Sequence, residues 1–219
     1  MVAEPRRDAD SVRDLLQTMG REVLARFRQT LKALESLDVE AAGKAVAEDS
    51  RTDEQELAVE RGCLDLLMAG KPGRVDVKRV LAMIKINTDL ERIADVATNI
   101  AECVEPLAHL GRGDVPDEIA EMSDIATEML TDALDAFGKK DTVLAGRVRQ
   151  RDDAMDVLNE EAYRLLLEAV ARDPEHLEFA THYVVVSKSL ERIADLCSNI
   201  AEHVIFMVTG EIVRHRGKP

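Results

Sequence analysis

The residues of this chain best suited to chemistry are carboxylates, and they lie in a segment that occurs twice. Residues 90–104 read LERIADVATNIAECV and residues 190–204 read LERIADLCSNIAEHV, with eleven of the fifteen positions identical. Each copy contains Glu-x-x-x-Asp, formed by Glu91 and Asp95 in the first and by Glu191 and Asp195 in the second. On a helix these two carboxylates lie on adjacent turns and repel each other unless a cation offsets them. The pattern therefore suggests a site for a cation.

More acidic residues precede each copy. They are Asp49, Asp53, Glu56 and Glu60 before the first copy, and Asp152, Asp156 and Glu160 before the second. Alignment of the copies pairs Asp49 with Asp152, and Asp53 with Asp156. If this preceding segment is a helix antiparallel to the repeated one, four carboxylates gather on one open surface of each repeat. Sites made only of carboxylate oxygens suit Mg²⁺, Ca²⁺, Mn²⁺ or iron rather than copper or structural zinc.

Two other interpretations of these residues stay open. Acidic residues four apart on a helix often form nothing more than a solvated face. The polar residues that the copies share could also be a docking surface for a protein partner, without any metal. The candidates for partner binding are Arg92, Asn99, Glu102, Arg192, Asn199 and Glu202.

Apolar residues recur at three- and four-residue spacing through most of the chain, which predicts long helices. The expected helices span about 8–36, 39–69, 75–110, 116–138, 141–172 and 174–213, separated by Gly- and Pro-containing turns such as Gly70-Lys71-Pro72-Gly73. Short connections make sequential helices antiparallel neighbours. The expected fold is all-α, with two tandem three-helix bundles related by internal duplication, over residues 8–111 and 116–213. In each repeated segment the apolar positions form one stripe for the core, and the shared polar residues lie opposite.

Composition excludes several classes of function. A net charge of −14 is unfavourable for binding nucleic acid or anionic lipid. No apolar run is long enough to span a membrane, so any membrane role is expected to go through a partner. Three cysteines without a CxxC pair indicate buried thiols in a reducing cytoplasm. His203 replaces Cys103 beside the core stripe and is expected to pack rather than bind metal.

Catalysis is not expected, because no nucleophile–base pair or Gly-rich phosphate loop is present. A ferritin-like di-iron enzyme or store is a weaker alternative, since such sites need Glu-x-x-His and ligands that point into the bundle core. A helical scaffold without any metal is the remaining alternative.

The two segments LERIADVATNIAE and LERIADLCSNIAE resemble the twice-repeated LERIGD-x-x-x-NIAE signature of the PhoU family of phosphate-signalling regulators. The acid pairs Asp49/Asp53 and Asp152/Asp156 resemble the paired acids on that family's preceding helix. Lys71-Pro72 and Asp173-Pro174 stand at its usual breaker positions, and the resemblance covers nearly the whole chain. The signature glycine is replaced by Ala94 and Ala194, which favour the helix and add a methyl group to the core face.

The resemblance implies a non-enzymatic cytoplasmic adaptor, often dimeric, that restrains the phosphate-starvation response. It implies two partners, the ATPase subunit of the phosphate ABC transporter and a membrane sensor histidine kinase. It also implies a divalent metal or an iron cluster, with Fe, Mn, Mg and Zn as candidates. The implied ligands are Glu91, Asp95, Asp49 and Asp53 in one half, and Glu191, Asp195, Asp152 and Asp156 in the other.

Overall fold

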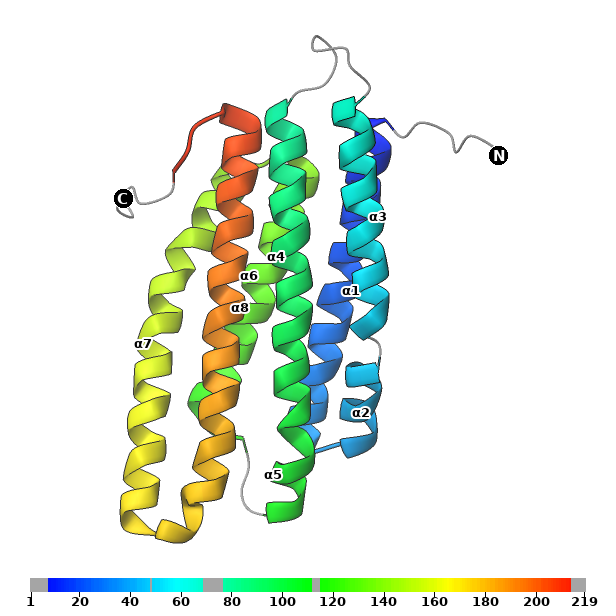
Figure 1. Cartoon of the computed structure of the whole chain (residues 1–219). Coiled ribbons are helices and arrows are strands. Elements are labelled where there is room, and N and C mark those ends of the chain that lie inside the picture. Colours follow the sequence, from blue (N-terminus) through cyan, green and yellow to red (C-terminus); the bar gives the residue numbers. More distant parts are fainter. Residues whose placement is uncertain (1–7, 48, 69–76, 112–114, 214–219) are drawn as a thin grey trace.

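The computed structural model describes residues 8–47, 49–68, 77–111 and 115–213, and it leaves the side chains of residues 49 and 50 undescribed. Within these ranges the chain is helical, with short connections (Figure 1). The helices are α1 (Ala9–Ser36), α2 (Val39–Ala47), α3 (Asp49–Met68), α4 (Val77–Glu102), α5 (Val104–Leu110), α6 (Asp117–Lys139), α7 (Thr142–Arg172), the 3₁₀ turn η1 (Pro174–His176) and α8 (Leu177–Thr209).

Side-chain caps and left-handed residues begin and end several helices. The Asp8 carboxylate accepts a hydrogen bond from the Ser11 backbone N–H at 2.8 Å and caps α1. Asp141 caps α7 by accepting from the backbone N–H groups of Val143 and Leu144 at 2.9 and 3.0 Å. These bonds satisfy N–H groups that have no partner within the helix. The short connection through Asp141 turns the chain sharply, so that α6 and α7 become neighbours.

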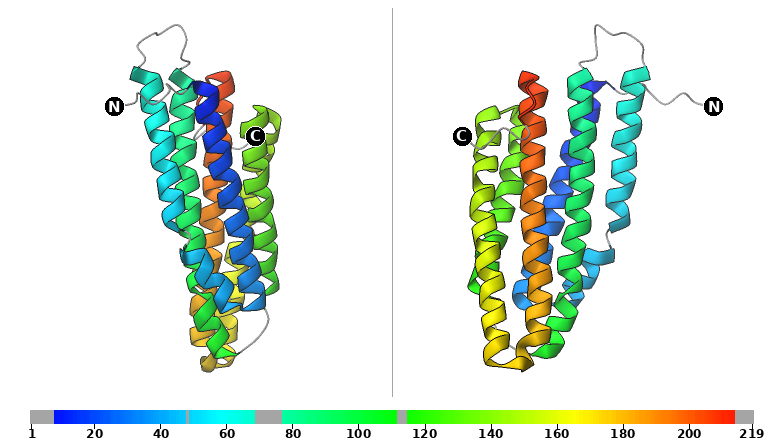
Figure 2. Two further views of the ribbon diagram at one scale, coloured as in Figure 1. Left: turned by 90° about the vertical axis from the view of Figure 1, so that its right-hand side faces the viewer. Right: turned by 60° about the vertical axis from the view of Figure 1, so that its left-hand side comes forward.

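The helices form two three-helix bundles, as predicted. The first contains α1, α3 and α4, with α2 and α5 as short additions, and the second contains α6, α7 and α8. In Figure 1, α7, α8, α4 and α3 stand side by side, and α6 and α1 lie behind them. Figure 2 shows the same layering from two other directions. The bundles meet where α4 packs against α8, and these two helices run in opposite directions.

The apolar half of each repeated segment forms the core, which confirms its prediction. Leu90, Ile93 and Ile100 are 0 % exposed, and so are Leu190, Ile193 and Ile200. Ala94 and Ala194 are buried as well, at 1 % and 0 % exposure. Among the described residues, no helix combines the length and apolar character needed to cross a bilayer.

Three of the six expected helices differ from the prediction. The second expected helix is divided near residue 48 into α2 and α3, and its expected end at 69 and the Gly70–Gly73 breaker lie outside the described residues. The third is broken at Cys103, because Pro106 has no N–H to donate to the carbonyl of Glu102. The sixth starts as the 3₁₀ turn at Pro174. It ends at Thr209 rather than near 213, because Gly210 is left-handed with φ 79°.

Candidate carboxylate sites and membership of a family

The first acidic cluster consists of Asp53 and Glu56 from α3 with Glu91 and Asp95 from α4. Burial raises the pKa of Glu91 to about 7, and the negative charges of Asp95, Glu56 and Asp53 add to the effect. The pKa of Glu56 is also raised, first by burial and then by Glu60, Asp53 and Asp95. α3 and α4 therefore bring like charges together, where desolvation and mutual repulsion disfavour full ionisation.

Glu56 belongs to this cluster, although the sequence interpretation did not name it as a ligand. Asp49 begins α3, but its side chain lies outside the described part of the structure, so its role as a ligand remains a prediction. Glu56 is one turn beyond Asp53 and was recognised only as one acid in a series. The alignment of the repeats did not indicate Glu56 as a ligand, because the equivalent residue of the second repeat is Asn159, which is not acidic.

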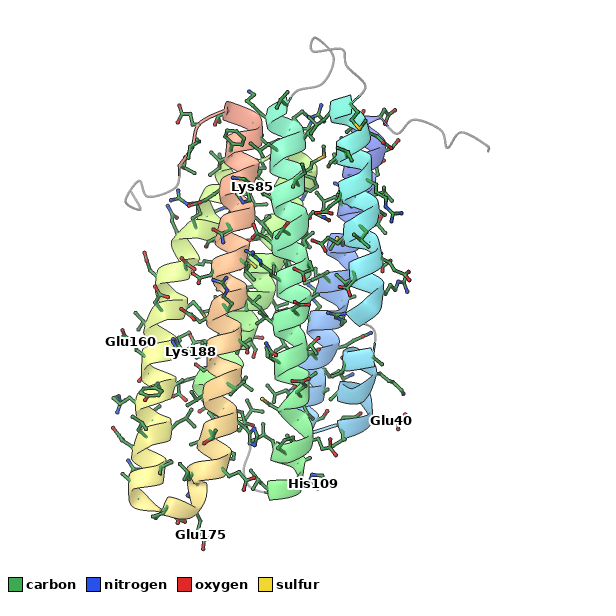
Figure 3. The ribbon with its side chains drawn as sticks, in the orientation of Figure 1. Glu40, Lys85, His109, Glu160, Glu175 and Lys188 are labelled. Atoms are coloured by element: carbon green, nitrogen blue, oxygen red, sulfur yellow. The ribbon has the colours of Figure 1, made fainter. Side chains whose placement is uncertain are left out.

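The second acidic cluster consists of Asp152 and Asp156 from α7 with Glu191 and Asp195 from α8, all four predicted from sequence. Burial raises the pKa of Asp195, and the charges of Asp152, Glu191 and Asp156 raise it further. Arg192 opposes that shift, with its Nη1 3.7 Å from Asp195 Oδ2. Glu160 extends from the side of α7 away from α8 in Figure 3, and it is not among the charges that act on Asp195.

The two clusters differ in the polar residues packed beneath them. In the first repeat, Asn87 is fully buried and donates from Nδ2 to the Glu56 carbonyl oxygen at 3.1 Å. Its Oδ1 has no hydrogen-bond partner among the described residues. In the second repeat, the equivalent residues satisfy each other, because the Ser187 hydroxyl donates to Asn159 Oδ1 at 2.7 Å. The first repeat thus has the carboxylate of Glu56 and the unpaired Oδ1 of Asn87. At the equivalent positions, the second repeat has two neutral side chains that are hydrogen-bonded to each other.

The residues predicted to bind a partner are unevenly accessible. Arg92, Asn99 and Glu102 of α4 are exposed, and so is Arg192 of α8. Asn199 is only partly exposed. The side chain of Glu202 is 15 % exposed and forms an ion pair with Arg149 of α7 at 3.3 Å. α7 therefore covers much of Glu202, and its role in partner binding stays a prediction.

The donor atoms of both clusters suit a hard divalent cation. All of the carboxylates offer oxygen. Burial, and then the neighbouring negative charges, raise the pKa of Glu91 and that of Asp195, and a bound cation would offset both effects. In the described part of the chain, however, no three His, Cys, Asp or Glu side chains already converge to hold an ion. The carboxylates fit a metal by chemistry, and their side chains would have to draw closer to bind it.

Among the described residues, neither cluster contains a histidine or a cysteine. His203 is buried, as predicted, and Cys63, Cys103 and Cys197 are free thiols in the core. Burial raises the pKa of Cys63 and that of Cys103 to about 11, so both thiols stay protonated and unreactive.

Comparison with known proteins agrees with the fold and with the doubled segment. The model of the PhoU domain matches residues 16–104 and 119–204. A PhoU homolog from Zymomonas mobilis, described as a phosphate-specific transport system accessory protein, is 32 % identical over 213 residues, covering 96 % of this chain and 90 % of the relative. The crystal structure of PhoU from Pseudomonas aeruginosa superimposes with a TM-score of 0.89 at 30 % identity, covering 92 % of this chain and 97 % of that one.

A second solved structure gives the same result. The phosphate transport system regulatory protein PhoU from Streptococcus pneumoniae superimposes with a TM-score of 0.86 at 26 % identity, covering 94 % of this chain and 97 % of that one. The matches extend over both three-helix bundles rather than one. The chain belongs to the PhoU family.

Proposed function

We propose that this chain is a cytoplasmic, non-enzymatic regulator of phosphate uptake and of the phosphate-starvation response. It acts as an adaptor between the ATPase subunit of the phosphate ABC transporter and a sensor histidine kinase, and it reaches the membrane only through these partners. It works as a homodimer. Relatives that match nearly its whole length and bear the name phosphate transport accessory protein support this role.

The observation that carries the proposal is that the same polar motif is exposed in both repeats. α4 and α8 pack side by side, and each exposes the arginine of its LERIAD sequence, Arg92 or Arg192. The core explains why the apolar positions are shared by the two repeats, but it places no such demand on exposed arginines. A surface for protein partners explains why these positions are also the same in both copies.

A deletion strain tests the regulatory role. In phosphate-rich medium, loss of this protein is expected to release the repression of a reporter fused to a high-affinity phosphate-uptake promoter. Re-expression of the wild-type chain is expected to restore repression. Unchanged repression in the deletion strain would overturn the proposal.

We further propose that the acidic clusters bind divalent cations or iron. Glu91 and Asp95 with Asp53, Glu56 and Asp49 would hold the metal in the first repeat. Asp152, Asp156, Glu191 and Asp195 would hold it in the second. When bound, the metal would neutralise the carboxylates and join the two helices of each pair. The all-oxygen donors and the raised carboxyl pKa values support this role.

Metal analysis of protein prepared without chelator tests this part of the proposal. The wild type is expected to hold metal in stoichiometric amounts, and Glu56→Gln is expected to lose part of the first repeat's share because affinity follows the number of charged ligands. Glu54→Gln is the matched control, since Glu54 is exposed on the same helix and does not act on Glu91. Equal metal content in Glu56→Gln and Glu54→Gln would remove Glu56 from the site. No metal in the wild type would contradict the metal proposal and leave the adaptor role intact.

A further inference from the structure

Asn87 of α4 is a buried polar residue with only one end of its amide paired. Its side chain is 0 % exposed and lies between α3 and α4, where Nδ2 donates to the Glu56 backbone carbonyl oxygen at 3.1 Å. Its Oδ1 has no hydrogen-bond partner among the described residues. An unpaired acceptor in the interior is unfavourable, so the folded protein gains if a ligand provides a partner for this oxygen.

Asn87 lies beneath the first acidic cluster. Glu91 follows it by four residues on α4, which places the two side chains on adjacent turns of one face. Because helical side chains lean towards the N-terminus, Glu91 extends over the turn that contains Asn87. On the other side, the amide contacts the backbone of Glu56, whose charge acts on Glu91. The amide is therefore next to the place where α3 and α4 bring their carboxylates together.

The second repeat has the same two positions but fills them differently. Asn159 replaces Glu56, and Ser187 replaces Asn87. Both residues are buried, and the Ser187 hydroxyl donates to Asn159 Oδ1 at 2.7 Å. The fold can therefore fill these positions with two neutral side chains that bond each other. The carboxylate and the amide of the first repeat are an addition that the packing of a bundle does not require.

A cation suits both the amide oxygen and the acids around it. A buried water would bond the oxygen, but it would not offset the negative charge of the cluster. Ca²⁺ takes about six to eight oxygen ligands, including Asn side-chain carbonyls, whereas Mg²⁺ needs near-octahedral geometry and gives up its waters reluctantly. Because Asn87 is fully buried, an ion that contacts its Oδ1 has lost its water on that side. This requirement favours Ca²⁺ over Mg²⁺.

We propose that Asn87 is a ligand of the metal site in the first repeat and makes that site selective for Ca²⁺ over Mg²⁺. Its amide provides a neutral oxygen from the interior, and the carboxylates of the first cluster provide the negative charge. The second repeat, with Asn159 and Ser187 at these positions, binds Ca²⁺ more weakly and discriminates less between the two ions. This inference rests on the proposed metal binding and names the ion that the first site prefers.

Calorimetric titration of chelator-treated protein with CaCl₂, and separately with MgCl₂, tests the proposal. All proteins carry Asp156→Asn with Asp195→Asn, which removes two charged ligands from the second cluster so that the first cluster dominates the signal. Asn87→Ser, which copies the other repeat, is expected to lower the Ca²⁺ affinity by about ten- to a hundredfold. The Mg²⁺ affinity is expected to change much less. Asn99→Ser makes the same substitution at an exposed position of α4 and is expected to keep both affinities.

A second variant separates metal binding from packing. Glu56→Asn with Asn87→Ser reproduces the hydrogen-bonded pair of the second repeat, so its metal-free form is expected to melt no lower than the protein without these two changes. Its Ca²⁺ affinity is expected to fall further than that of Asn87→Ser, because a charged ligand is lost as well.

The outcomes separate this inference from the metal proposal on which it rests. If Asn87→Ser and Asn99→Ser bind both ions with the same ratio of affinities, Asn87 is not a ligand, and the metal proposal stands. A lower melting temperature with an unchanged ratio would likewise overturn the inference, since it would show a packing role alone. A protein with both clusters intact that binds neither ion would also overturn it, and the metal content of the protein as prepared would then decide the wider proposal.

Discussion

Glu91→Gln is expected to raise the melting temperature of the metal-free protein at pH above about 7, and to have no such effect at pH below about 4.5. The expected gain above neutral pH is about 2–4 °C, which is the shift that one kcal/mol produces in a protein of this size. Melting curves of both proteins, recorded in chelator over this pH range, provide the measurement.

The sign follows from the environment of Glu91. Its pKa is raised from 4.5 to about 7, because burial and the charges of Asp95, Glu56 and Asp53 disfavour its ionised form. Between these two values the folded state holds a proton that the unfolded state has released. Stability is therefore lost as the pH rises from 4.5 to 7, and the loss is complete above 7. Glutamine has nothing to ionise, so the variant avoids this loss.

Added divalent cation is expected to reverse the order of stability at the upper end of the range. A cation that binds the folded state stabilises the wild type in proportion to its affinity, and Glu91→Gln removes one charged ligand. Glu54→Gln again provides the control, and it should follow the wild type both with and without cation. A wild type and a Glu91→Gln variant with identical melting curves at every pH would contradict this account of the cluster.

The core half of the repeated segment could be predicted because its cause is local. Leu90, Ile93 and Ile100 follow the helical period, and a three-helix bundle buries whatever lies on that stripe. The same period placed Ala94 and Ala194 in the core, where the structure finds them. The packing of His203 was predicted from its place beside the stripe, whereas its neighbour Asp89, whose Oδ2 lies 3.3 Å from His203 Nε2, was not predicted. Asp89 comes from the other repeat, and contacts between helices far apart in sequence leave no periodic signal.

The clusters could be predicted only in part, because they depend on how two helices face each other. Asp152 and Asp156 meet Glu191 and Asp195 as expected, since α7 is continuous through that region. In the first repeat, α2 and α3 are separate helices, and an apolar pattern alone does not fix the rotation of α3 against α4. That rotation brings Glu56 into the first cluster. The burial of Glu202 could not be predicted for a similar reason, because the side chain that covers it comes from α7.

Removal of both exposed arginines, Arg92→Ala with Arg192→Ala, is expected to abolish regulation while leaving the fold intact. Substitutions at exposed positions usually change the free energy of unfolding by no more than about 0.5 kcal/mol. Arg192 has one weak contact, at 3.7 Å from Asp195. Circular dichroism and thermal unfolding should therefore match the wild type, so a loss of repression would report on partner binding.

The control is the double variant Arg21→Ala with Lys32→Ala. It changes two exposed residues of α1, which lies in the layer behind α4 and α8. This pair removes the same amount of positive charge from another part of the surface. It is expected to repress as the wild type does.

The most direct measurement is the phosphate-uptake reporter in phosphate-rich medium, read in a deletion strain that carries one of these three proteins at equal levels. The predicted result is that the wild type and the α1 control repress the reporter. The Arg92/Arg192 variant is expected to leave reporter expression as high as in the deletion strain. Full repression by a folded Arg92/Arg192 variant would contradict the claim that the doubled polar face carries the function.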